Sequence, residues 1–103
     1  MKNSQPLISV IMSAFNSEKS IGKALESIIN QEYKNFEFLV LDDFSTDNTY
    51  EIIQEYSKTD NRVRVYKNEK NIGLTKSLNI LIKNSKGDYI ARQDADDVSL
   101  KNR

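Results

Sequence analysis

The chain has 103 residues, and its 15 Lys or Arg residues balance its 15 Asp or Glu residues. This length suits one domain with a single core, and the lack of a basic excess argues against nucleic acid as a partner. There is no Cys and no His, which excludes disulfides, zinc sites with thiolate or imidazole ligands, and Ser–His triads within the chain. No apolar stretch approaches the roughly 20 residues needed to span a bilayer, and the N-terminus lacks the apolar core of a signal peptide.

The N-terminal third of the sequence predicts a strand followed by a helix. Residues 7–12 form a nearly continuous apolar run, which is typical of a strand covered on both faces. Asn16 and Ser17 offer side chains suited to the N-cap of the helix that follows. The apolar residues of that helix recur at the spacing of one helical face; they are Ile21, Ala24, Leu25, Ile28 and Ile29.

The middle of the sequence repeats this order. A second strand is predicted over residues 36–41, and the Ser-Thr-Asp segment 45–47 suits the N-cap of a second helix. The stripe of that helix consists of Thr49, Ile52, Ile53 and Tyr56. Residues 62–66 then alternate polar and apolar side chains, which predicts a third strand nearer to an edge of the sheet.

The last third adds a helix and a strand. Residues 71–73 open a third helix, whose apolar positions are Leu74, Leu78, Leu81 and Ile82. Residues 85–87 end this helix, and Gly87 is placed to adopt the left-handed conformation of a C-cap. Residues 88–92 predict a fourth strand, and the apolar run at residues 89–91 indicates that this strand is buried.

Three strand–helix pairs followed by a strand predict an α/β fold, namely a Rossmann-like parallel sheet with flanking helices and right-handed crossovers. Ligands of such sheets bind beyond the carboxyl ends of the strands. Residues 13–16, 42–43 and 94–96 all follow predicted strands. We therefore expect these three segments to converge on one edge of the sheet.

Acidic residues follow two of the predicted strands. Asp94, Asp96 and Asp97 lie within four residues of one another, and Asp42 and Asp43 end the second strand. Carboxylates this close repel one another unless a cation lies among them. Mg²⁺ and Mn²⁺ are hard cations that take oxygen ligands. The two acidic strand ends therefore predict a divalent metal and a polyanionic ligand.

Four segments together resemble family 2 glycosyltransferases with the GT-A fold. They are residues 7–16, 42–47, 71–73 and 89–97. The segments follow the order and approximate spacing of the family, and the match covers essentially the whole chain. The resemblance implies a nucleotide-sugar donor, a divalent cation (Mn²⁺ or Mg²⁺), and transfer of the sugar to an acceptor hydroxyl.

The resemblance also implies roles for individual residues. The ends of the first two strands would hold the nucleoside through Ser13, Phe15, Asn16, Asp42 and Asp43. The Asp-x-Asp motif of the family falls on Asp94 and Asp96. Asp96 would bind the metal that bridges the diphosphate, and Asp94 would orient the ribose or the metal. Asp97 would support the side chains of Asp94 and Asp96.

Two positions depart from the commonest pattern of the family, and the role of catalytic base is assigned to no residue of the chain. Phe15 stands where relatives often carry Tyr, so its ring can stack on a base but lacks the hydroxyl. Leu78 stands where many relatives carry Arg, and Lys76 is the candidate to supply that charge to the nucleotide sugar. The catalytic base is expected beyond residue 103.

Each candidate position has a simpler interpretation that the sequence leaves open. The acids that follow the fourth strand can cap a further helix or pair with Arg92 in place of a metal. Ser13 and Asn16 can satisfy backbone groups at the junction of strand and helix, and Phe15 can belong to the core. The acidic pair after the second strand can be a turn.

The expectations for the whole protein follow from the resemblance. Residues 1–103 are expected to form a single nucleotide-sugar-binding domain, truncated at its C-terminus, inactive alone and prone to self-association. A UDP-sugar is the favoured donor, and a glycan or lipid-linked acceptor in bacterial polysaccharide biosynthesis is expected. The predicted location is cytoplasmic, with peripheral attachment to the inner face of the membrane as an option. A non-catalytic nucleotide-binding module and a phospho-acceptor signalling domain stay open as alternatives.

Overall fold

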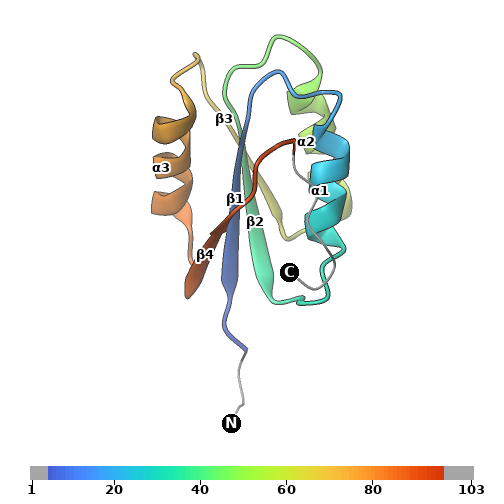
Figure 1. The fold of residues 1–103 in the computed structure, drawn as a ribbon, viewed down its shortest axis with the longest axis vertical. Helices are drawn as coiled ribbons and strands as arrows, with labels where there is room; N and C mark the ends of the chain where they lie inside the picture. Colours follow the sequence, from blue (N-terminus) through green and yellow to red (C-terminus); the bar gives the residue numbers. More distant parts are fainter. Residues whose placement is uncertain (1–4, 97–103) are drawn as a thin grey trace.

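The computed structural model describes residues 5–96, so Asp97 lies outside the described residues. Four strands form one parallel sheet in the order β3-β2-β1-β4. Helices α1 and α2 cover one face of the sheet and α3 covers the other (Figure 1). The bounds are β1 (Ile8–Ala14), α1 (Ile21–Ile29), β2 (Phe36–Asp42), α2 (Thr49–Thr59), β3 (Val63–Lys67), α3 (Leu74–Asn84) and β4 (Tyr89–Arg92). The predicted fold class is confirmed.

The central strands β1 and β2 are buried because helices cover both faces of the sheet. Side chains alternate between the two faces along each strand. Met12 therefore packs in the core beneath α1 and α2, whereas the neighbouring Ile11 packs with Leu41 in the core beneath α3. This burial on both sides explains the nearly continuous apolar runs in the sequence.

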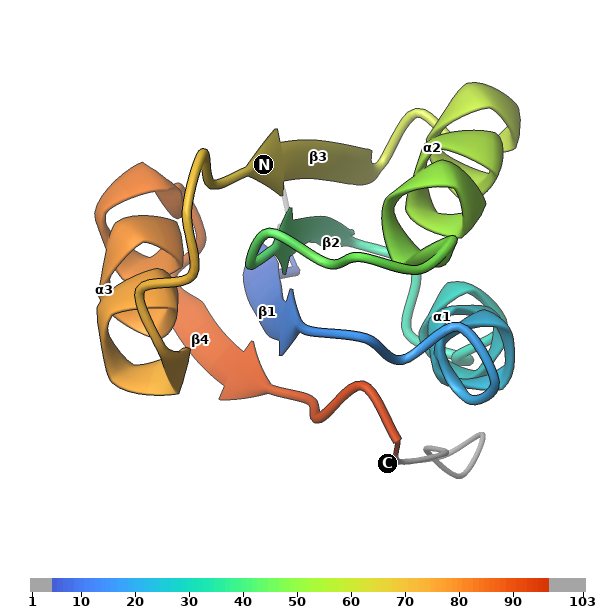
Figure 2. The same cartoon turned by 90° about the horizontal axis from the view of Figure 1, so that it is seen from above.

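The positions of the helices follow from the direction in which the chain moves across the sheet. The chain steps from β1 to β2 to β3 in one direction and then returns past both central strands to β4. Because crossovers between parallel strands are right-handed, the first two helices lie on one face and the third lies on the opposite face, as Figure 2 shows.

Strand β4 is an edge strand, and the prediction that it is buried is wrong. Among residues 5–96 it pairs with β1 alone, over the register Ile8↔Tyr89 to Ile11↔Arg92. Tyr89 is 65 % exposed and Ile90 is 47 % exposed. An apolar run cannot show whether a strand has one neighbour or two, because periodicity carries no information about strand order. This exposed apolar surface supports the predicted self-association, which stays a prediction.

Two predicted helix ends also differ from the structure. Helix α1 begins at Ile21 without a side-chain cap, because residues 17–20 form a turn in which Ser17 O accepts the N–H groups of Ser20 and Ile21. The predicted capping by Asn16 and Ser17 is therefore wrong. At α2, the N-cap is Asn48, which makes no side-chain cap hydrogen bond, so the predicted capping by residues 45–47 is wrong in position. Asp47 Oδ1 nevertheless accepts the N–H of Thr49 at 3.0 Å.

Gly87 is needed for a close approach of two backbones, and its predicted left-handed conformation is wrong. Within the described part of the chain, Gly73 is the glycine with a positive φ. Gly87 instead donates its N–H to Ser9 Oγ at 2.8 Å. A Cβ at Gly87 would lie 2.6 Å from Ser9 Oγ and 2.8 Å from Leu7 O. Both distances are shorter than the van der Waals contacts that Cβ atoms make in proteins.

Replacing Gly87 with Ala is expected to lower the free energy of unfolding by about 2 kcal/mol, because overpacking forces the two backbones apart. Gly22→Ala is the matched control. Its Cβ would meet Tyr56 Oη at an ordinary 3.6 Å, and Ala is the better helix former. Urea denaturation of both variants measures the difference. Equal stability of the Gly87 variant and the wild type would contradict this packing.

Within residues 5–96, no helix has both the length and the apolar character needed to cross a membrane.

Candidate functional site

The carboxyl edge of the sheet gathers the three predicted segments. Ala14 pairs with Asp42 and Ile11 pairs with Arg92, so β1, β2 and β4 run in one direction and end at the same edge. Figure 2 looks onto this edge, and the loops that follow the three strands lie side by side in it. The backbone contact between Asp43 N–H and Ala14 O, at 2.8 Å, continues the pairing just beyond the strands.

Asp43 binds the loop between β3 and α3. Its Oδ1 accepts the N–H of Ile72 and the Asn68 amide, each at 2.9 Å, and its Oδ2 accepts the N–H of Gly73 at 2.9 Å. Burial raises the pKa of Asp43, but these three hydrogen bonds outweigh burial and bring the pKa below its usual 3.8. Because a carboxylate oxygen can accept two hydrogen bonds, Oδ2 has capacity for one more, but Asp43 is buried, at 3 % exposed.

Asp42 faces the interior of the protein. Its side chain is fully buried, and Oδ2 accepts the N–H of Ser45 at 3.1 Å. Its Oδ1 has no hydrogen-bond partner among the described residues. Asp43 is only slightly less buried, at 3 % exposed, so burial does not decide which of the two acids contacts a nucleoside.

Asn16 joins the loop after β1 to the loop after β2. Its Oδ1 accepts the N–H of Thr46 at 2.8 Å, and its own N–H donates to Ser45 Oγ at 2.9 Å. This is the backbone-satisfying role that the sequence left open for Asn16. These contacts fix the two loops relative to each other, so the carboxyl edge of the sheet is preorganised for a ligand.

The other predicted nucleoside residues differ in exposure. Ser13 is half-buried at the end of β1, and Lys76 is exposed in the first turn of α3. Phe15 is 48 % exposed, so the interpretation of Phe15 as a core residue is wrong. Its ring is available for contact with a ligand at the carboxyl edge.

Asp94 forms an ion pair with Arg92, whose Nη2 lies 3.1 Å from Asp94 Oδ1. This is the pairing that the sequence offered as an alternative to a metal. Both side chains are about half exposed, at 50 % and 48 %, and exposed ion pairs contribute at most about 1 kcal/mol. The pair is therefore weak enough for a cation or a ligand to displace Arg92.

Asp96 lines an open cleft beside the start of α1. Ala95, the residue between the two acids, is buried in the core beneath α1 and α2, and Ser20 Oγ donates to Ala95 O at 3.1 Å. These contacts anchor the loop and leave Asp96 exposed. The cleft has a volume of about 500 Å³ and is lined by Asn16, Ser17, Glu18, Lys19, Ser20, Asp47 and Asp96. Asp43 is not part of its lining.

The described residues hold no ready-made metal cage. Between residues 5 and 96, no group of three or more Asp or Glu side chains could hold a metal ion. The third predicted acid, Asp97, lies outside the described part. A metal at Asp94 and Asp96 would therefore need oxygen ligands in addition to these two side chains.

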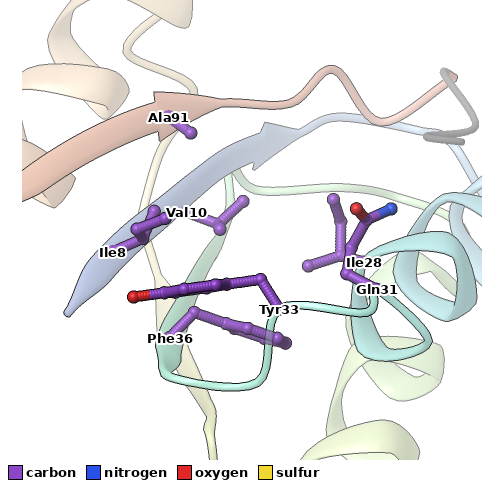
Figure 3. A pocket seen from close by; sticks show the side chains of 7 residues that line it. All are labelled: Ile8, Val10, Ile28, Gln31, Tyr33, Phe36 and Ala91. Atoms are coloured by element: carbon purple, nitrogen blue, oxygen red, sulfur yellow. The ribbon is translucent and has the colours of Figure 1, made fainter. Parts of the chain in front are cut away.

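A second pocket, of about 200 Å³, lies at the opposite edge of the sheet. It is lined by Ile8, Val10, Ile28, Gln31, Tyr33, Phe36 and Ala91. Figure 3 shows β1 and β4 side chains on one side of the pocket and the rings of Tyr33 and Phe36 on the other. The lining is mostly apolar, and the Tyr33 hydroxyl donates to Pro6 O. This pocket contains no predicted site residue.

Sequence reasoning missed two residues at the carboxyl edge. Asn68 directly follows β3 and donates to both Asp43 Oδ1 and Ser77 Oγ. Its place two residues after the predicted strand 62–66 was the available signal. Phe44 lies between Asp43 and Ser45, is 46 % exposed and has a φ of 64°. A left-handed backbone at Phe could not be read from the sequence.

The comparisons with known proteins assign the class. The chain matches the family model "Glycosyl transferase family 2" over residues 9–103, and it belongs to that family. It is 43 % identical over 102 residues to the putative glycosyltransferase EpsE of Bacillus subtilis (strain 168), covering 98 % of this chain and 37 % of the relative.

Two further similar proteins are described with a nucleotide or nucleotide sugar. The chain is 37 % identical over 97 residues to the UDP-Glc:alpha-D-GlcNAc-diphosphoundecaprenol beta-1,3-glucosyltransferase WfgD of Escherichia coli, covering 94 % of this chain and 38 % of WfgD. The crystal structure of S. aureus TarS 1-349 in complex with UDP superimposes with a TM-score of 0.85 and 35 % identity, covering 92 % of this chain and 29 % of that one. The fold is thus the GT-A type. The chain spans little more than a third of the length of EpsE and WfgD.

Proposed function

We propose that the chain is the donor-binding part of a glycosyltransferase. It binds a nucleotide-diphosphate sugar, with a UDP-sugar favoured, together with a divalent cation. The sugar is transferred to a hydroxyl of a glycan or lipid-linked acceptor in bacterial polysaccharide biosynthesis. The name of WfgD and the complex of TarS with UDP support the choice of UDP, and the name of WfgD supports a lipid-linked acceptor.

One observation carries the proposal, namely the order of the strand ends at the carboxyl edge. The ends of β2 and β4 lie on either side of β1, which separates them by two strand spacings, or roughly 10 Å. A nucleoside diphosphate has its base and its phosphates at opposite ends. We assign the nucleoside to Asp43 and the phosphates to Asp96, and the exposed Phe15 follows β1, the strand between them.

The remaining nucleotide contacts come from the same edge. Ser13 and Asn16 shape the strand end against which the ribose lies, and Lys76 supplies a positive charge from the first turn of α3. Asp42 supports the loop from beneath by accepting the N–H of Ser45. These roles divide the predicted nucleoside residues into those that contact the ligand and those that hold the loops in place.

The residues at the end of β4 suit a divalent cation. Asp94 and Asp96 offer hard oxygen ligands, and Mg²⁺ in phosphate sites commonly takes one or two carboxylates together with oxygens of the phosphates. A cation of this kind, Mn²⁺ or Mg²⁺, would stabilise the charge that develops on the leaving diphosphate. The side chains of this chain orient the donor, and the base that activates the acceptor is assigned to none of them.

Paramagnetic NMR tests the shared site. Mn²⁺ added together with UDP is expected to broaden the amide signals of residues 13–16, 43–45 and 92–96. Signals of Ile8 and Tyr89, which lie at the opposite edge of the sheet, are expected to stay sharp. The same titration with diamagnetic Mg²⁺ separates ligand-induced shifts from broadening. Broadening centred on the opposite edge, or none at all, would contradict the proposal.

The two alternative functions lead to different results. A non-catalytic nucleotide-binding module would give the same NMR result but no sugar transfer when the chain is supplied with the remaining two thirds of a full-length relative. A phospho-acceptor domain would be labelled on an Asp by acetyl phosphate. No feature of the described residues favours it, because the segment after β1, residues 13–16, carries no carboxylate. The cytoplasmic location and the truncation of the domain stay predictions.

A further inference from the structure

Phe44 has an unusual backbone conformation for its residue type. Its φ is 64°, in the left-handed region where a side chain with a Cβ crowds its own carbonyl group. Glycine or Asn usually occupies such positions. The ring nevertheless remains 46 % exposed, so burial of the side chain does not explain why a bulky residue is held there.

The residues on both sides of Phe44 are firmly anchored. Asp43 donates its N–H to Ala14 O at 2.8 Å, and Asp43 O accepts the Asn71 amide at 3.2 Å. On the other side, the N–H of Ser45 donates to Asp42 Oδ2 at 3.1 Å. The loop therefore imposes the left-handed conformation on Phe44 and fixes the direction in which its ring leaves the backbone. Strain of this kind is found preferentially at ligand-binding sites.

The position of Phe44 places a second exposed ring at the proposed nucleoside site. The register Ala14↔Asp42 brings Phe15 level with Asp43, so Phe44 follows one residue further along the neighbouring loop. Phe15 and Phe44 are 48 % and 46 % exposed. Two exposed aromatic rings just beyond the ends of neighbouring strands are well suited to a planar base, because aromatic rings stack on the face of any base.

We propose that Phe44 is a positioning residue for the nucleobase of the donor, its ring contacting the base whose N–H is accepted by Asp43. The inference rests on the proposed function, since it concerns the same nucleotide. It adds a contact that the sequence did not predict. It also explains why the loop keeps a bulky residue at a position where glycine would cost less conformational energy.

The test is calorimetric titration of UDP with Mg²⁺ into the wild type, Phe44→Asn and Phe44→Tyr. Asn tolerates the left-handed conformation and removes the ring, so Phe44→Asn is expected to keep the melting temperature and to weaken UDP binding about tenfold or more. Phe44→Tyr keeps the ring and is expected to bind within about twofold of the wild type. Tyr89→Asn makes the same kind of change at a 65 % exposed aromatic residue on the opposite edge and is expected to leave binding unchanged.

The results distinguish a failure of this inference alone from a failure of the proposed function. Wild-type binding of UDP combined with equally tight binding by a folded Phe44→Asn overturns the role of Phe44 alone. A loss in Phe44→Tyr as large as that in Phe44→Asn also overturns it. If Phe44→Asn melts well below the wild type, the same comparison is made with Phe44→Gly, which removes both the ring and the strain. Failure of the wild type to bind UDP overturns the proposed function and the inference together.

Discussion

Asp43→Asn is expected to lower the free energy of unfolding by about 2–3 kcal/mol, because buried donors that lose a charged acceptor are costly. The carboxylate accepts two backbone N–H groups and one amide through its two oxygens. A carboxamide has one oxygen, so its NH₂ group must face at least one of these donors. For a domain of this size the melting temperature should fall by about 10 °C or more. Urea denaturation and thermal melting measure both quantities.

The control and the pH dependence make this prediction specific. Glu55→Gln changes a side chain that is 76 % exposed and should alter stability by less than about 0.5 kcal/mol. Hydrogen bonding brings the pKa of Asp43 below its ordinary value of 3.8. The contribution of Asp43 is therefore complete above pH 3.8 and is lost as the pH falls through the lower pKa of the folded state. A stability difference between wild type and Asp43→Asn that does not narrow in acid would contradict this account.

Asp96→Asn is expected to weaken strongly the dependence of UDP binding on a divalent metal. The carboxylate of Asp96 is exposed at the cleft beside α1, whereas Asp94 is already paired with Arg92. An amide oxygen is a poorer ligand for a hard cation, so the enhancement of UDP binding by Mn²⁺ should fall at least tenfold, or by about 1.4 kcal/mol. Calorimetric titration of UDP with and without Mn²⁺ gives this enhancement directly.

Asp88→Asn is the matched control for Asp96→Asn. Asp88 accepts the N–H of Leu7 at 3.0 Å, immediately before the start of β4 and at the opposite edge of the sheet. Its replacement should leave the effect of Mn²⁺ on UDP binding unchanged. An unchanged effect in Asp96→Asn, or an equal loss in both variants, would show that Asp96 does not hold the cation.

The elements of the fold were predictable because they depend on local periodicity. The apolar run of β1 and the helical stripes of α1 and α2 reflect which side chains face a core. The predicted stripe of α3 is wrong in part, because Leu74 and Ile82 are 48 % and 45 % exposed. The parallel sheet followed from the alternation of strands and helices. The exposed character of β4 was not predictable in this way, since it depends on which strand lies at an edge. The same holds for Gly87, whose requirement comes from Leu7 and Ser9, far away in the sequence.

The candidate site was predictable in outline and not in detail. The carboxyl ends of parallel strands meet at one edge, so residues 13–16, 42–43 and 94–96 could be brought together from the sequence. The hydrogen bonds that divide their roles could not, because the partners of Asp43 lie 25 to 30 residues away. The left-handed backbone of Phe44 is likewise imposed by contacts of its neighbours and leaves no signal in composition.

The central claim is that the acidic ends of β2 and β4 serve one nucleotide and its cation. Calorimetric titration of UDP, GDP and dTDP into the wild type, each with and without Mn²⁺, tests it most directly. We expect one nucleotide per chain, tightest binding for UDP, and affinity that rises when Mn²⁺ is present. Absence of binding for all three nucleotides, or binding that Mn²⁺ leaves unchanged, would contradict the claim.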